Sequence, residues 1–215
     1  MLQLNKLVLV FILALKLAGS YVPEKVIVTV YYESQCPDSR RFVEGQLLPT
    51  IKLLHEYITL KLVPFGKAKS IRHGNGGFKC QHGPTECTGN IVQSCALDLM
   101  QERSDLEKVS YVECEMQTEA GTRRDMRCVT RAGLSGREVL QCVDSTAGLI
   151  LQLDHEYQTK LIRPSFIPTI TINRVFDQNV QNSAFQDLTG TVCSVLRNAA
   201  PCARYYNTLA LDYVY

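Results

Sequence analysis

The nine cysteines of this 215-residue chain are the sequence feature that most restricts its fold. In an oxidising compartment most of them should be paired, and each disulfide adds about 2–4 kcal/mol of stability. Nine is an odd number, so one thiol is left over, and the candidate is Cys36 because it lies far upstream of the rest. The other eight are Cys80, Cys87, Cys95, Cys114, Cys128, Cys142, Cys193 and Cys202. Of their many possible pairings we predict only two local bridges, Cys80–Cys87 and Cys193–Cys202.

The first twenty residues have the pattern of a secretory signal peptide. Lys6 precedes an apolar run from Leu7 to Leu15, and Ala18-Gly19-Ser20 supplies small residues for cleavage. A membrane anchor is the alternative, but a span requires roughly 20 apolar residues and Lys16 interrupts a shorter run. We therefore expect cleavage of residues 1–20, entry into the secretory pathway, and a mature chain without a membrane span.

The composition is that of a globular protein, with 46% apolar and 20% charged residues. Residues 21–215 are long enough for one domain with a hydrophobic core, elaborated by an insertion. The net charge is only +2, with the two signs interspersed, so charge gives no reason to propose nucleic acid as a partner.

The first part of the mature chain predicts a βαβ unit. Residues 25–32 are a continuous β-branched and aromatic run, which favours a buried strand. Apolar residues then recur at helical spacing from Pro37, and Pro49 within that stretch implies a kink or a break. Residues 58–63 alternate as a second strand.

The remainder predicts a helical insertion followed by a return to the sheet. Residues 72–77 form a glycine-rich loop, and residues from about 90 to about 160 have helical periodicity. Pro168 precedes a short strand, residues 173–182 form a hairpin region, and residues 184–197 form a closing helix. The expected fold class is α/β, a thioredoxin-like fold with a disulfide-crosslinked helical insertion at approximately residues 80–160.

This layout gives Cys36 a chemical meaning. At the end of the first strand and the start of the next helix, unpaired N–H groups and the helix dipole favour a thiolate, which is the nucleophilic form of cysteine. The Ile167-Pro168 step, just before a late strand, is a candidate for the cis-proline that lies beside the nucleophile in thioredoxin-like folds.

A motif between these two points identifies a family. Its fixed positions are Cys80, Gln81, His82, Gly83, Glu86, Cys87, Asn90 and Cys95. This pattern resembles the signature of the gamma-interferon-inducible lysosomal thiol reductase (GILT) family. The resemblance extends to Cys36, Pro168 and the remaining cysteines, and so covers nearly the whole mature chain.

The motif has two less specific interpretations. Cys80, His82, Cys87 and Cys95 could bind zinc by ligand type, but the Cys-x-His gap is tighter than usual structural zinc spacings and the compartment favours disulfides. His82 could be a general base, although a histidine in a crosslinked loop is more often a structural hydrogen-bonding residue. We expect a scaffold, with no metal and no cofactor.

The resemblance implies a thiol–disulfide oxidoreductase that reduces protein disulfides, extracellular or lysosomal in location. Family members typically carry Cys-x-x-Cys, whereas this chain has Cys36-Pro37-Asp38-Ser39. Serine cannot form a disulfide, so the second thiol of the usual cycle is missing. Ser39 could donate a hydrogen bond to the Cys36 thiolate, whereas the Asp38 carboxylate would disfavour it.

Three functions remain open from the sequence. The first is a one-thiol reductase, with Cys36, Ser39 and Pro168 in the active site, disulfide-bonded protein clients, and an external small thiol as reductant. The second is a non-catalytic binding protein on the same fold with a degenerate site. The third is a one-thiol disulfide isomerase. No Asn-x-Ser/Thr sequon occurs in the chain, so glycan-based sorting to lysosomes has no support.

Overall fold

The computed structural model describes residues 25–197 and 199–212. The predicted signal peptide, residues 1–20, lies outside this range. Within it, no helix has both the length and the apolar character needed to span a bilayer.

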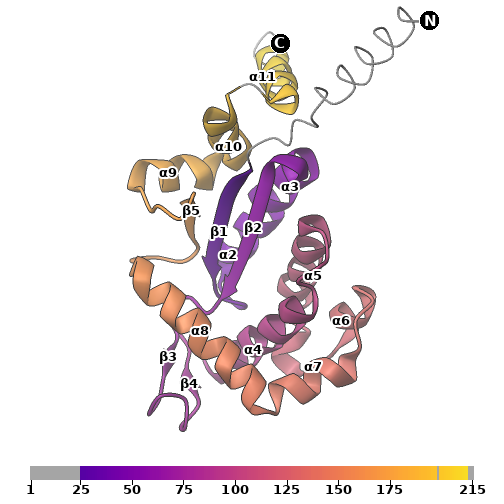
Figure 1. Ribbon diagram of the computed structural model, residues 1–215, viewed down its shortest axis with the longest axis vertical. Helices are drawn as coiled ribbons and strands as arrows, with labels where there is room; N and C mark the ends of the chain where they lie inside the picture. The colour runs from indigo at the N-terminus through magenta and orange to yellow at the C-terminus, as the bar shows by residue number, and fades with distance from the viewer. Residues whose placement is uncertain (1–24, 198, 213–215) are drawn as a thin grey trace, which may run out of the picture.

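A three-stranded sheet forms the centre of the fold, in the order β2-β1-β5 (Figure 1). Strand β1 (Val26–Tyr32) pairs in parallel with β2 (Ile58–Pro64) and antiparallel with β5 (Thr169–Ile172). Strand β1 lies between the other two strands, and its side chains are almost all buried, as its apolar and β-branched pattern predicts. The parallel β1–β2 pair with its helical connection confirms the βαβ unit.

The connection between β1 and β2 is a helix of changing pitch. It consists of α2 (Pro37–Phe42), the π-helical segment η1 (Val43–Leu47) and α3 (Leu48–Leu54), followed by the short η2 (His55–Tyr57). Pro49 has no N–H to donate to the preceding turn, and the helical hydrogen bonding changes just before it. The irregularity predicted at Pro49 is therefore present as a π-helical segment within the helix.

Five helices come between β2 and β5 in the sequence. In space they curve around the lower end and one side of the sheet (Figure 1). A 3-10 turn, η3 (Gly121–Arg123), precedes the third of them. The helices are α4 (Pro84–Leu99), α5 (Asp105–Thr118), α6 (Arg127–Arg131), α7 (Gly136–Val143) and α8 (Thr146–Ile162). The helical character predicted for residues 90–160 is confirmed.

Four disulfides crosslink the chain. Cys80–Cys87 and Cys193–Cys202 are the two local bridges predicted from the sequence. Cys95–Cys142 joins α4 to α7, and Cys114–Cys128 joins α5 to α6. Three of the four therefore lie within or just before the helical segment.

The predicted hairpin at residues 173–182 is wrong. Asn173 and Arg174 have positive φ values of 51° and 67°, and the chain turns back after β5 with only an isolated bridge between Ile172 and Val175. Asp177 then accepts hydrogen bonds from two backbone N–H groups and starts α9 (Gln178–Gln186). A helix cap thus replaces the second strand of the expected hairpin.

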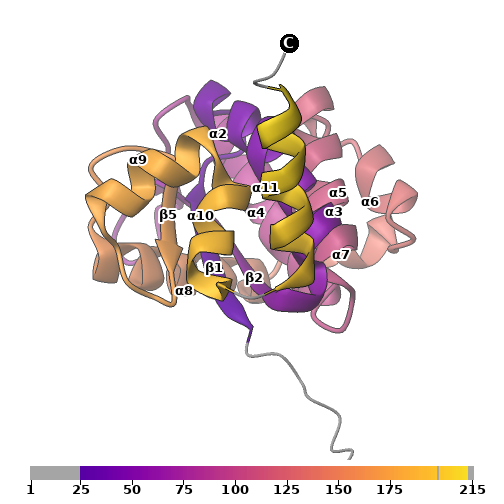
Figure 2. The ribbon, with the colours of Figure 1, turned by 90° about the horizontal axis from the view of Figure 1, so that it is seen from above.

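The predicted closing helix at residues 184–197 is two helices. Asp187 ends α9 and caps α10 (Leu188–Leu196) by accepting a hydrogen bond from the Gly190 N–H at 2.7 Å. A further helix, α11 (Ala200–Asp212), follows and is held to α10 by the Cys193–Cys202 bridge. Figure 2 shows α9, α10 and α11 gathered around the end of the sheet where β1 begins.

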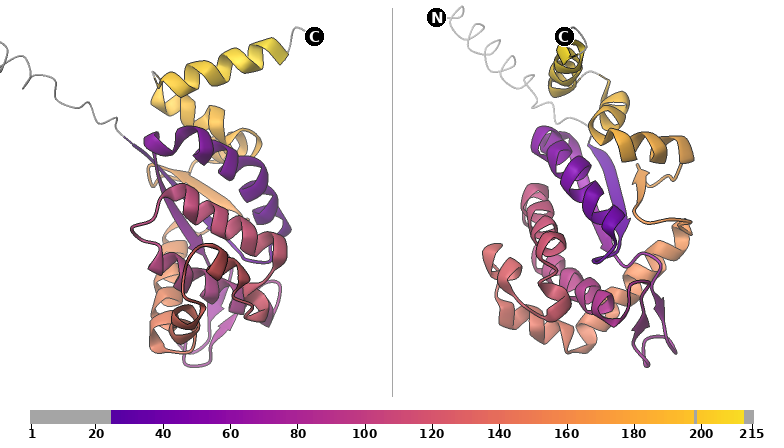
Figure 3. Two further views of the ribbon diagram at one scale, coloured as in Figure 1. Left: turned by 90° about the vertical axis from the view of Figure 1, so that its right-hand side faces the viewer. Right: turned by 180° about the vertical axis from the view of Figure 1, so that it is seen from behind.

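A small β-ribbon lies between β2 and α4 in the sequence. Strands β3 (Lys69–Ser70) and β4 (Phe78–Lys79) pair antiparallel, and the glycine-rich segment 72–77 forms the loop between them. Figure 3 shows this ribbon projecting from the body of the molecule beside α8. The ribbon was not predicted from the sequence, because two-residue strands give no periodic signal.

Candidate functional site

Cys36 occupies the N-cap position of α2, where β1 gives way to the helix. Its backbone is extended, with φ −73° and ψ 121°, and its C=O accepts the Arg40 N–H at 3.0 Å. Pro37 at the first helical position needs no hydrogen-bond partner for its nitrogen, which suits this start. Cys36 is the free cysteine of the chain, because the other eight are in disulfides, and its residue is 8% exposed.

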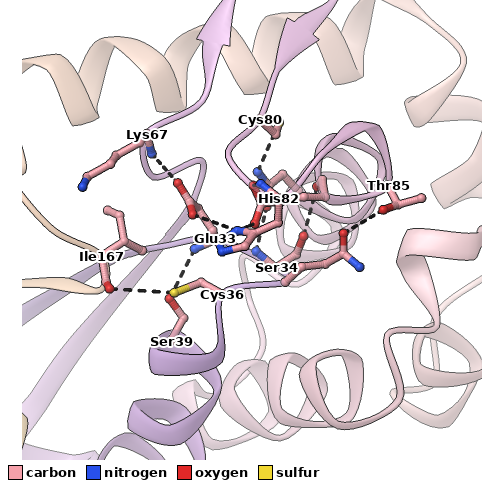
Figure 4. Close-up of polar contacts among 12 residues, drawn as sticks. Glu33, Ser34, Cys36, Ser39, Lys67, Cys80, His82, Thr85 and Ile167 are labelled. Carbon is pink, nitrogen blue, oxygen red and sulfur yellow. Dashed lines mark hydrogen bonds and ion pairs between the residues drawn. The ribbon is translucent and has the colours of Figure 1, made fainter.

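The Ile167-Pro168 peptide bond is cis and lies against Cys36. Cys36 Sγ lies 3.8 Å from the Ile167 carbonyl oxygen, 131 residues along the chain (Figure 4). The structure therefore brings together the cysteine and the proline step that the sequence predicted to be neighbours. The approach follows from the sheet, since β5 pairs with β1 immediately after Pro168.

Ser39 is fully buried one helical turn after Cys36. Its hydroxyl oxygen accepts a weak hydrogen bond from the Glu33 N–H at 3.5 Å (Figure 4). Among the side chains that the structure describes, no hydrogen bond joins Ser39 Oγ to Cys36 Sγ. The sequence suggested a hydrogen bond between Ser39 and the Cys36 sulfur, whereas the structure shows one between Ser39 and the backbone of Glu33.

Asp38 is ion-paired with a neighbour. Its carboxylate forms an ion pair with Arg41 on the exposed side of α2. The sequence alone suggested that Asp38 would disfavour a thiolate at Cys36. The Arg41 pair weakens that effect, because the guanidinium offsets the carboxylate charge.

Two buried glutamates, Glu33 and Glu86, have one histidine, His82, between their carboxyl groups. Figure 4 labels Glu33 and His82 together with Cys36. Glu33 follows β1 directly, and its Oε1 accepts the Lys67 N–H at 2.6 Å. Glu86 Oε1 accepts the His82 N–H at 3.0 Å. The other oxygen of each faces His82 Nδ1, at 3.4 Å for Glu33 and 2.5 Å for Glu86. His82 is therefore a hydrogen-bonding residue of the motif, as predicted.

This cluster is better described as hydrogen-bonded than as metal-binding. Its three donor atoms lie within 4.8 Å of one another, which is compact enough for a metal site. However, His82 Nδ1 and Glu86 Oε2 are 2.5 Å apart, which is a hydrogen-bonding distance. The alternative zinc site at Cys80, Cys87 and Cys95 is contradicted, since all three sulfurs are in disulfides.

Glu33 is the site residue that sequence reasoning missed. The Glu33 side chain packs directly against the backbone of Gly66. Any larger residue at position 66 would clash with it, because a Cβ there would lie 2.2 Å from Glu33 Cγ, and Gly66 also has a positive φ of +59°. Glu33 Oε2 is buried without a hydrogen-bond partner. The only signal in the sequence was a glutamate directly after an otherwise apolar strand. That signal does not reveal that Glu33 lies close to residues 66–67.

We expect the free energy of unfolding to be higher at pH 5 than at pH 7.5. Burial, with a smaller contribution from Glu86, raises the pKa of Glu33 to about 7, and burial likewise raises the pKa of Glu115 to about 7. Both groups bind a proton more tightly when folded, so their stabilisation is complete below about pH 4.5 and is lost as the pH rises through about 7. Burial lowers the pKa of His155 to about 4, which acts in the opposite direction.

The two carboxyls contribute about 2 kcal/mol each between these pH values and His155 opposes them by about 2 kcal/mol, leaving a net gain of about 2–3 kcal/mol. Urea unfolding at both pH values measures this difference. Glu33→Gln should remove about 2 kcal/mol of the dependence, while Glu102→Gln at an exposed position should leave it unchanged. An unaltered pH dependence in Glu33→Gln would contradict the assignment to Glu33.

Comparisons with known proteins place this site in a family. Residues 27–132 match the family described as gamma interferon inducible lysosomal thiol reductase (GILT). The chain is 32% identical over 207 residues to GILT-like protein 1 of Drosophila melanogaster, covering 89% of this chain and 82% of that protein. It is 31% identical over 183 residues to the gamma-interferon-inducible lysosomal thiol reductase of Carassius auratus, covering 83% and 71%. The chain belongs to the GILT family.

Solved structures establish the fold class of this GILT family member as thioredoxin-like. BdbD from Bacillus subtilis has a TM-score of 0.54 at 12% identity, covering 84% of this chain and 91% of that chain. DsbA from Chlamydia trachomatis has a TM-score of 0.52 at 14% identity, covering 82% and 94%. Membership in a thiol reductase family on this fold supports a thiol–disulfide oxidoreductase in general, with disulfide-containing substrates.

Proposed function

We propose that this protein reduces disulfides of protein clients through a single nucleophilic cysteine, Cys36. The observation that carries the proposal is the position of this free cysteine, at the start of α2 and against the cis Ile167-Pro168 step. A serine occupies the place where a second thiol would stand. Pro168 contributes the backbone edge beside the sulfur, where an extended client segment would lie.

In the first step the Cys36 thiolate attacks one sulfur of a client disulfide. A bond forms between Cys36 Sγ and that sulfur, and the client S–S bond breaks. The second client sulfur leaves as a thiolate and takes a proton from solvent. The product is a mixed disulfide between the protein and its client, with one client thiol released.

Release of the client requires an external small thiol, because Ser39 cannot attack the mixed disulfide. The small thiol, as its thiolate, attacks Cys36 Sγ and expels the client sulfur, which is protonated. A second small thiol then frees Cys36 and leaves as a small-molecule disulfide. The two small thiols supply the two electrons and two protons that convert the client disulfide to two thiols.

A non-catalytic binding protein is the second candidate, and the burial of Cys36 favours it. Only 8% of the Cys36 residue is exposed, so little room is left for a client disulfide to approach its sulfur. In the related isomerase proposal, a client thiol resolves the mixed disulfide and no small thiol is consumed. Turnover that depends on an added small thiol distinguishes the reductase from both.

The location follows from the same proposal. The signal peptide at residues 1–20 would direct the chain into the secretory pathway, to an extracellular or lysosomal destination. Residues 21–215 would form one mature domain with the helical insertion at approximately residues 80–160. The net stabilisation expected at acidic pH is compatible with an endolysosomal compartment.

The mature native protein should contain one titratable thiol. Eight cysteines are in disulfides, so alkylation followed by mass spectrometry should label Cys36 alone, slowly in the native protein because the residue is buried and rapidly in denaturant. Cys36→Ala should show no label in either condition and form no mixed disulfide with an insulin-type client. Labelling at any other cysteine in the native protein would contradict the assignment.

A further inference from the structure

We propose that an open groove, linked to Cys36 through Glu33, binds an acidic polypeptide segment of the client, which deepens and rests on the function proposed above. The groove has a volume of about 770 Å³. Its walls are the turn after β2 from Gly66 to Lys69, the end of β4 with Cys80 and Gln81, and the C-terminal end of α8 through Pro164. Its first two walls lie close together in the sequence, and the third comes from a distant helix.

The groove is strongly cationic. A single acidic side chain, Glu156, lies among its walls, and it already binds Lys160 at 2.9 Å and the Ser70 N–H at 3.2 Å. Positive charges therefore exceed negative ones by four, although the whole chain has a net charge of only +2. The five cations, all exposed, are Lys67, Lys69, Lys79, Lys160 and Arg163.

Two of these cations are held directly opposite each other. Lys69 pairs with Lys79 across the β3–β4 ribbon, and neither has an ion-pair partner among the residues that the structure describes. Like charges at directly opposed positions of a β-pair destabilise it. A carboxylate bound between the two ammonium groups would remove that repulsion, so the ribbon gains stability when an anion is present.

Two connections link the walls of the groove to the nucleophile. On one side, the Lys67 N–H donates to Glu33, whose own carbonyl accepts the Cys36 N–H at 3.3 Å. On the other side, Pro164 begins the segment that leads to Ile167, 3.8 Å from the sulfur. Figure 4 labels two residues of the groove, Lys67 and Cys80, together with Glu33 and Cys36. A client segment lying in the groove would present its neighbouring disulfide to Cys36.

The shape and spacing of the charges favour a polypeptide over other anions. A volume of several hundred Å³ suits an extended segment of a few residues. A flat bilayer surface would not enter a groove, and a small anionic thiol would meet only some of the five cations. An extended segment with several Asp or Glu residues could pair with cations on opposite walls.

Binding can be tested without turnover by using the full mature Cys36→Ala protein. The probes are fluorescent peptides with one central disulfide, flanked by four Glu, four Lys or four Ser residues. At 50 mM NaCl we expect the Glu peptide to bind at least about tenfold more tightly than the Lys peptide, and the difference to shrink at 500 mM NaCl because salt screens exposed charges. Equal affinities at low salt would overturn the proposal.

The location of the site is tested by Lys69→Glu/Lys79→Glu in the same background, which should abolish the preference for the Glu peptide over the Lys peptide because the groove then has three cations and three acids. Lys52→Glu/Arg137→Glu changes the net charge equally at exposed positions on α3 and α7, and should leave affinities within about twofold. Equal effects of both pairs would overturn the site. Lys79→Gln, with smaller structural risk, should weaken the Glu peptide about threefold, and circular dichroism checks the fold of each variant.

Two competitors test the class of ligand. Reduced glutathione at millimolar concentration, or vesicles with 30% phosphatidylserine, should not displace the Glu peptide; displacement by either would overturn the choice of a polypeptide. Failure of the reductase proposal would have a different outcome, because Cys36→Ala would still bind the Glu peptide while the protein with Cys36 showed no turnover.

Discussion

Replacing Ser39 with cysteine is expected to raise the rate of insulin-type disulfide reduction in a dithiol-driven assay by about tenfold or more. Residues three apart on a helix share a face, so a thiol at position 39 would lie beside Cys36. It would attack the mixed disulfide within the same molecule, where effective concentration is high, instead of waiting for an external thiol. Ser39 is fully buried, so the added sulfur would be shielded from other reactants.

The unsubstituted protein should instead accumulate as a mixed disulfide with its client when small thiol is scarce. Non-reducing electrophoresis measures that species. Cys36→Ala/Ser39→Cys is the matched control and should show neither the increased rate nor the mixed disulfide, because the nucleophile is gone. If Ser39→Cys is no faster while Cys36 still reacts with an alkylating agent, the binding-protein proposal becomes the better one.

Removing the Cys95–Cys142 bridge is expected to lower the free energy of unfolding by about 4 kcal/mol. The two cysteines are 47 residues apart, and closing a loop of that length removes much of the conformational entropy of the unfolded chain. The bridge also fixes α7 against α4, and its Cys95 is part of the buried core. Cys95→Ala/Cys142→Ala should therefore be measured against the intact protein by urea unfolding.

Two controls locate the effect. Cys193→Ala/Cys202→Ala opens a bridge with a separation of only 9 residues, so the loss should be smaller, about 3 kcal/mol. Cys36→Ala removes a buried sulfur without opening any bridge and should cost the least. A loss below about 1 kcal/mol for the Cys95–Cys142 pair would show that the unfolded chain is already compact without it.

The sequence predicted the parts of the fold that depend on local pattern. The β1 strand is an unbroken apolar run, and the helix after Pro37 has regular spacing, so Cys36 could be assigned to their junction. The Cys80–Cys87 and Cys193–Cys202 bridges were predictable because each closes a short loop. The fold class followed from the order of these elements, together with the family resemblance.

The remainder depends on contacts between distant residues. The Cys95–Cys142 pairing requires α4 and α7 to be placed first, and no local pattern does that. The hairpin expected after β5 was wrong because Asp177 caps a helix there, and the single closing helix was wrong because Asp187 caps a second one. Glu33 and the cationic groove were missed for the same reason: their neighbours come from the turn at residues 66–69 and from the end of α8.

The same kind of bond that this protein is proposed to break in its clients also holds its own helices together. A small thiol that releases Cys36 could therefore reduce the protein itself, unless the sulfurs are difficult to reach. Cys95, Cys128, Cys193 and Cys202 are each 1% exposed, so their bridges are shielded from attack. Only Cys80–Cys87 has both residues partly exposed, and its Cys80 lies in the wall of the groove. In a reducing compartment the working lifetime of the protein would then be set by burial, with the Cys80–Cys87 loop as the first part to loosen.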